Sequence, residues 1–167
     1  MKIPVLCLIG RSGTGKTTVI ERLIPLLKSK GVSVATIKHH NHDFEMDRKG
    51  KDTYRHKEAG ARIAMIVSPR KLALVEDTER EPELNEIVDR YIRSVDFVIV
   101  EGFKTAAVPK IEVYNFRDGV LPLALGDNDL LAIVSDRAIP APVPVFLRDD
   151  VDRLAGFIIE KLRLGCD

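Results

Sequence analysis

The chain alternates between short apolar runs and longer stretches in which apolar residues recur at helical spacing. Residues 3–9 form an apolar run typical of a buried parallel strand, and residues 19–27 then show helical spacing ahead of Gly31. Three further runs repeat the buried-strand pattern, at residues 32–37, 97–100 and 130–134. This alternation predicts an α/β fold with a mostly parallel sheet.

Other segments predict departures from a simple parallel sheet. Two apolar runs, residues 62–68 and 71–75, are separated by two residues and predict an antiparallel hairpin. An exposed apolar hairpin favours aggregation unless it is covered, and a partner subunit is one way to cover it. Residues 111–116 alternate in hydrophobicity and predict a strand with one exposed face, whereas residues 143–146 predict a short edge strand.

The composition fits one soluble globular domain over residues 1–167, with 45% hydrophobic and 31% charged residues. A net charge of +1 gives no reason to expect nucleic acid or an anionic membrane as a partner. The apolar stretch at the N-terminus is too short for a signal peptide or a membrane span. Cys7 and Cys166 show no paired spacing, which favours a reducing, cytoplasmic setting over a disulfide or zinc framework.

The segment between the first predicted strand and helix matches the Walker A phosphate-loop pattern G-x-x-x-x-G-K-[ST]. Glycines let the loop curl so that backbone N–H groups point at phosphate oxygens, and the helix N-terminus adds positive charge. Lys16 is expected to reach the β and γ phosphates, and the Thr17 hydroxyl to ligate Mg²⁺. The predicted nucleotide-binding residues are Gly10, Ser12, Gly13, Thr14, Gly15, Lys16, Thr17 and Thr18.

A second chemical signal follows the apolar run 97–100, which ends in Glu101. An acid at the end of a central strand is typical of a Walker B site, where Glu101 would hold Mg²⁺ through water or polarise the attacking water. We therefore expect Thr17 and Glu101 at the metal, with Lys16 and Glu101 as catalytic groups and Lys104 as a second anion contact.

A basic, histidine-containing segment follows the strand predicted at residues 32–37. His39, His40 and His42 admit a metal site, a solvated loop, or a loop that contacts nucleotide or acceptor, with Lys38 meeting anionic oxygens. The sequence leaves these alternatives open.

With both motifs placed, the chain resembles the MobB family of molybdopterin-guanine dinucleotide biosynthesis adaptor proteins over nearly its whole length. The resemblance rests on residues 12–18, 37–39, 42–43, 47, 50–52, 59–61, 100–104 and 134–136. It implies a P-loop NTPase three-layer fold with an antiparallel hairpin extension, GTP and Mg²⁺ binding, weak GTPase activity and homodimers. It also implies cooperation with MobA, the guanylyltransferase that attaches GMP to molybdopterin. Whether molybdopterin contacts this chain is left open.

The sequence leaves alternatives open for recognition of the nucleotide base and for the class of biochemical function. No N-K-x-D guanine motif occurs, and Asp136 at a strand end fits either a guanine-reading acid or an ordinary turn cap. An adaptor that binds GTP is the main functional hypothesis. A small-molecule P-loop kinase would need a lid of arginines, for which only residues 48–62 qualify. A GTPase for metal insertion would use the histidine segment.

Overall fold

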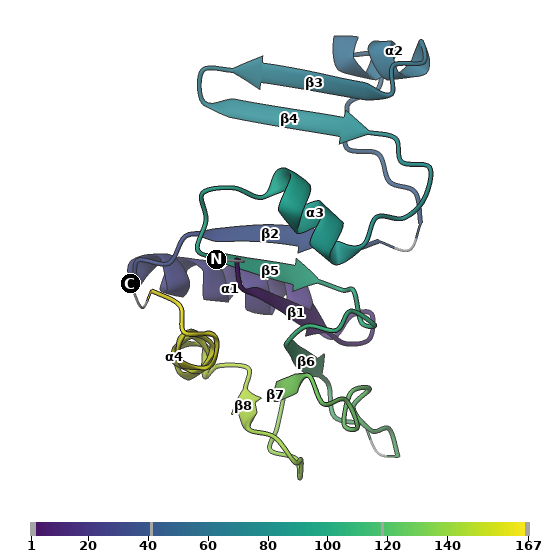
Figure 1. Ribbon diagram of the computed structural model, residues 1–167. Coiled ribbons are helices and arrows are strands. Elements are labelled where there is room, and N and C mark those ends of the chain that lie inside the picture. Colours follow the sequence, from purple (N-terminus) through teal and green to yellow (C-terminus); the bar gives the residue numbers. More distant parts are fainter. Residues whose placement is uncertain (1–2, 41, 118, 166–167) are drawn as a thin grey trace. The chain divides into compact units, whose positions relative to one another are not determined.

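Six strands in the described part of the chain, residues 3–40, 42–117 and 119–165, form one sheet in a computed structural model (Figure 1). All neighbouring strands are parallel, in the order β2-β5-β1-β6-β7-β8. The strands are β1 (Val5–Ile9), β2 (Val34–Lys38), β5 (Phe97–Glu101), β6 (Lys110–Tyr114), β7 (Leu130–Ser135) and β8 (Val145–Leu147). This confirms the predicted α/β class and its parallel sheet.

Strand order determines what meets at the carboxyl edge of the sheet. Strand β1 lies between β5 and β6, and β5 lies between β1 and β2. Because parallel strands end on the same edge, the segment after Ile9 emerges beside Glu101. The register pairs Glu101 with both Leu8 and Lys38.

One face of this sheet is covered by α1 (Lys16–Ser29) and α4 (Val151–Leu162). Helix α1 buries the apolar positions of its predicted helical pattern, and burial of a leucine such as Leu23 or Leu27 contributes about 1.5–3 kcal/mol. Strand side chains on this face complete the core with Leu6, Leu8, Phe97, Ile99, Ile111, Val113, Ala132 and Val134. This packing fixes the start of α1 against the end of β1.

The other face of β6 corrects the sequence prediction of a half-exposed strand. All five residues of β6 are buried, because the segment between β6 and β7 folds over that face. The Glu112 oxygens accept hydrogen bonds from the backbone N–H groups of Leu123 (2.8 Å) and Ala124 (2.9 Å). Lys110 Nζ lies 2.9 Å from Asp127 Oδ2. The polar positions of the alternating pattern are therefore buried but paired.

The described residues form two compact units, one from the chain up to His39 together with that from Val88 onward, and one from His40 to Ile87. The second contains α2 (Asp52–Glu58) and the antiparallel pair β3 (Ile63–Ser68) and β4 (Lys71–Glu76). The hairpin prediction is confirmed, and one domain over residues 1–167 stays a prediction. Helix α3 (Leu84–Tyr91) crosses the boundary in sequence. No helix in the described residues is long and apolar enough to cross a membrane.

Candidate functional site

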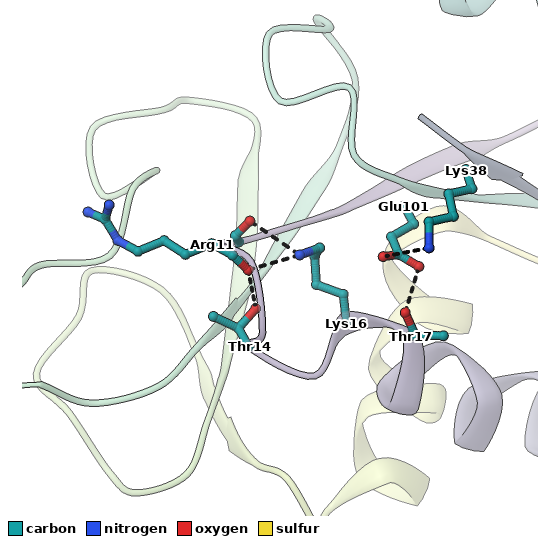
Figure 2. A network of polar contacts seen from close by, with 7 residues as sticks. Arg11, Thr14, Lys16, Thr17, Lys38 and Glu101 are labelled. Atoms are coloured by element: carbon teal, nitrogen blue, oxygen red, sulfur yellow. Dashed lines mark hydrogen bonds and ion pairs between the residues drawn. The ribbon is translucent and has the colours of Figure 1, made fainter. Parts of the chain in front are cut away.

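The phosphate-loop residues form a tight turn between β1 and α1. Lys16 begins α1, and its Nζ donates hydrogen bonds to the carbonyl oxygens of Gly10 (3.4 Å) and Arg11 (2.9 Å) (Figure 2). The Thr14 hydroxyl donates to the Arg11 carbonyl at 3.0 Å. An ammonium group has three N–H donors, so Lys16 can hold the loop and still reach a phosphate oxygen.

The remaining predicted loop residues lie in the same turn. Ser12 and Gly13 are exposed in the loop, while Thr17 and Thr18 are exposed in the first turn of α1. The first-turn N–H groups of a helix have no intrahelical partner, and they carry the positive end of its dipole. The structure thus brings the predicted residues from Gly10 to Thr18 together at one corner beside the N-terminus of α1, and helix N-termini are typical places for anions to bind.

Glu101 stands beside this corner at the end of β5, as Figure 2 shows. Its Oε2 accepts a hydrogen bond from the Thr17 hydroxyl at 3.0 Å, and its Oε1 lies 3.9 Å from Lys38 Nζ. Mg²⁺ is typically bound by one or two protein oxygens together with phosphate oxygens and water. The hydroxyl of Thr17 and the carboxylate of Glu101 fit that requirement. The described residues contain no cluster of three or more His, Cys, Asp or Glu suited to a metal.

Several lysines lie near Lys16 and the Glu101 carboxylate. The pKa of Lys16 lies below its ordinary value, mainly because the side chain is partly buried. The Glu101 carboxylate raises this pKa, and the charges of Lys104 and Lys38 lower it. The positive charges of Lys38 and Lys104 therefore both act on Lys16. Such a field suits a polyanion such as a triphosphate, whose charge would relieve their mutual repulsion.

Arg148, which sequence reasoning missed, directly follows β8 and anchors the phosphate loop. Its Nη2 donates to the carbonyl oxygen of Thr14 at 2.6 Å and contacts Oδ1 of Asn115. Gly15 has φ 87°, and a Cβ there would lie 2.6 Å from Arg148 Nη1, so glycine leaves room for the guanidinium.

This contact also orients a backbone amide. In a trans peptide the C=O and N–H groups point in opposite directions. Anchoring the Thr14 carbonyl on Arg148 therefore directs the Gly15 N–H away from the guanidinium. The sequence signal that was overlooked is the place of Arg148 just after a short strand, at the carboxyl edge of the sheet.

Asp136 lies after β7, at the same edge. Its Oδ1 accepts hydrogen bonds from the Phe116 N–H (2.8 Å) and the Ser135 hydroxyl (3.3 Å). The Phe116 N–H is the main cause that holds the pKa of Asp136 below its ordinary value. Asp136 therefore joins the ends of β6 and β7, and its role in guanine recognition stays a prediction.

The three histidines make different local contacts. The His39 ring lies against Phe103, with 4.3 Å between ring centroids. His40 Nδ1 is 3.0 Å from the backbone oxygen of His42. His39 belongs to the unit that holds the phosphate loop, and the other two belong to the second unit.

The chain is similar in sequence to proteins of one known family. The MobB family model, described as Molybdopterin guanine dinucleotide synthesis protein B, matches residues 5–136. The chain is 36% identical over 165 residues to the molybdopterin-guanine dinucleotide biosynthesis adapter protein of Escherichia coli (strain K12), covering 96% of this chain and 94% of that protein. It is 32% identical over 158 residues to the adapter protein of Haemophilus influenzae (strain ATCC 51907 / DSM 11121 / KW20 / Rd), covering 94% and 88%.

Solved structures of MobB proteins also align with nearly the whole chain. The crystal structure of molybdopterin-guanine biosynthesis protein B (mobB) aligns with a TM-score of 0.72 at 32% identity, covering 95% of this chain and 99% of that chain. The crystal structure of Bacillus subtilis MobB aligns with a TM-score of 0.78 at 26% identity, covering 95% and 98%. With these likenesses, and with a phosphate loop inside a parallel α/β sheet, the chain belongs to the MobB family.

Proposed function

We propose that this protein is a GTP-binding adaptor in molybdenum cofactor biosynthesis. In this role it assists the guanylyltransferase MobA, which converts molybdopterin to molybdopterin guanine dinucleotide. The observation that carries the proposal is the prepared corner in which Thr17 and Glu101 meet beside Lys16. The names of the family and of its relatives connect that corner to guanine dinucleotide synthesis.

In this proposal the loop N–H groups and Lys16 bind the phosphates, and Thr17 with Glu101 hold Mg²⁺. Bound there, Mg²⁺ supplies charge neutralisation of the phosphate oxygens. Lys16 is already oriented over the loop by two backbone carbonyls, so little side-chain ordering remains for binding.

Slow hydrolysis by the isolated chain belongs to the same proposal. Arginine fingers raise the rate of P-loop GTPases by about 10³–10⁵. Arg11, within the loop, extends away from Lys16 in Figure 2, and Arg148 is engaged with the Thr14 carbonyl. Neither is placed as a finger in this state, which suits a protein that holds GTP for another enzyme.

The homodimer is proposed on the β3–β4 hairpin. Paired positions share a face, so Met65 and Val67 of β3 lie with Leu72 of β4 on one face. Val67 is 66% exposed and Leu72 63% exposed. An apolar face of this kind is typical of a surface that a second copy covers.

Calorimetric titration with GTP and with ATP in Mg²⁺ tests the nucleotide proposal. Wild type is expected to bind GTP more tightly than ATP. Lys16→Ala should weaken GTP binding by about tenfold to a hundredfold, because it removes a charge-assisted phosphate contact. Lys30→Ala, at an exposed lysine beyond the end of α1, is the matched control. Equal GTP affinity in wild type and Lys16→Ala would refute the site.

A further inference from the structure

Lys38 is the last residue of β2, and its position is set by the sheet. It is in parallel register with Glu101, the last residue of the neighbouring β5. Its Nζ lies 3.9 Å from Glu101 Oε1, while Glu101 Oε2 accepts the hydrogen bond from the Thr17 hydroxyl. One carboxylate thus contacts both the hydroxyl expected at Mg²⁺ and the ammonium of Lys38 (Figure 2).

The backbone around Lys38 is held firmly against the end of β5. The His39 N–H donates to the Glu101 carbonyl at 2.9 Å, and the His39 ring lies against Phe103. Gly102 has φ 109°, and a Cβ there would come within 2.9 Å of His39 Cβ, so only glycine permits this approach. Phe103 has φ 48°, in the left-handed region that larger residues rarely adopt.

Such backbone conformations persist where the surrounding structure imposes them, and they cluster at functional sites. Here they occur directly after Glu101, where the hydrogen bond from the His39 N–H to the Glu101 carbonyl joins β2 to β5. The base of the Lys38 side chain therefore keeps its place relative to the phosphate loop, and only its flexible arm has to move.

The contact between Lys38 and Glu101 is well suited to exchange. The Lys38 side chain is 63% exposed, and its distance to Glu101 is at the long end for an ion pair. The Glu101 side chain is only 15% exposed, but the pair is long and its ammonium is open to solvent, so the ammonium gives up its carboxylate readily when a more highly charged anion arrives. Glu101 in turn can serve a divalent cation only by sharing or releasing Lys38.

We propose that Lys38 is a phosphate-binding residue that exchanges Glu101 for the terminal phosphate of a nucleoside triphosphate. This exchange lets the site distinguish a triphosphate from a diphosphate. The inference rests on the proposed nucleotide function, and it assigns to β2 a contact that the phosphate loop itself does not supply. The diphosphate lacks the terminal group, so with it Lys38 stays on Glu101.

Titrations of GTP and GDP in Mg²⁺ test the exchange in wild type, Lys38→Met and Lys38→Arg. Lys38→Met should weaken GTP binding about tenfold, the low end of the effect of one charged hydrogen bond because the side chain is exposed. GDP affinity should change less than twofold. Lys38→Arg keeps the charge and should recover most of the GTP affinity, and Lys30→Met is the control for charge removal elsewhere. Thermal unfolding checks that each variant is folded, and Lys38→Gln replaces Lys38→Met if the latter is not.

The outcomes separate the two proposals. An equal loss of GTP and GDP affinity in Lys38→Met, or no loss of either, would overturn the exchange while leaving the nucleotide site intact. Wild type that binds neither nucleotide would overturn both the exchange and the proposed function. A selective loss for GTP, restored by Lys38→Arg, is the result the geometry predicts.

Discussion

Replacement of Arg148 by methionine should loosen the phosphate loop without unfolding the sheet. The substitution keeps an unbranched aliphatic stem but removes the guanidinium, and with it the donor 2.6 Å from the Thr14 carbonyl and the contact with Asn115. A hydrogen bond from a charged donor contributes about 1.5–3 kcal/mol. Arg148 is only partly buried, so we expect the free energy of unfolding to fall by about 2 kcal/mol, the lower part of that range.

For a chain of this length a loss of that size lowers Tm by about 4–8 °C. The sharper assay is amide hydrogen exchange of the free protein. In Arg148→Met the amides from Gly13 to Thr17 should exchange faster, because the Thr14 peptide plane has lost its anchor. The amides of β1 and β5 should keep their protection. GTP affinity should also fall, because the phosphate loop of Arg148→Met is less ordered.

Two further variants make this test specific. Arg22→Met is the matched control, since Arg22 Nη1 donates to the backbone carbonyl of Arg148 (2.8 Å) and to the exposed Asp149 (3.3 Å). Its effect should stay below about 1 kcal/mol. Arg148→Lys should not restore protection, because an ammonium lacks the fork of a guanidinium. Loop exchange in Arg148→Met equal to that in Arg22→Met would refute the anchoring role.

Two other predictions concern Asp136 and the hairpin. Asp136→Asn should lower stability near neutral pH and should erase the preference for GTP over ATP if Asp136 reads guanine; competition titrations check the preference. Hydrogen bonding holds the pKa of Asp136 low in the folded protein. Its contribution to stability is therefore present above the unfolded pKa of about 3.9 and is lost as the pH falls through the lower folded pKa. The stabilities of wild type and Asp136→Asn should accordingly converge in acid. Leu72→Asp, on the exposed apolar face of the hairpin, should shift a dimer toward monomer. Lys71→Asp, on the other face of the hairpin, should leave the dimer in place. Light scattering that shows the same dimer in both variants would contradict this interface.

The local parts of the fold and site were predictable from sequence. Buried parallel strands read as continuous apolar runs, and the phosphate loop is a contiguous motif, so β1, the loop and α1 follow directly. The meeting of Thr17 with Glu101 was also predictable, because parallel strands end at one edge and place a strand-end acid beside the loop.

What the sequence did not reveal depends on pairing between distant segments. Arg148 and Thr14 are 134 residues apart, and no short motif connects them. The alternation in β6 suggested solvent on one face, yet Glu112 is buried because a later segment presents backbone N–H groups to it. Periodicity reports the polarity of a position, and it cannot distinguish water from a paired polar group as the neighbour.

Reconstituted guanylyl transfer onto molybdopterin by MobA, with and without this protein, tests the central proposal most directly. With GTP and Mg²⁺ present, wild type should accelerate formation of molybdopterin guanine dinucleotide, and Lys16→Ala should lose the effect because its phosphate site is impaired. Lys30→Ala should stimulate as wild type does. Robust multiple-turnover GTP hydrolysis by the isolated protein, with no stimulation of MobA, would contradict the adaptor account.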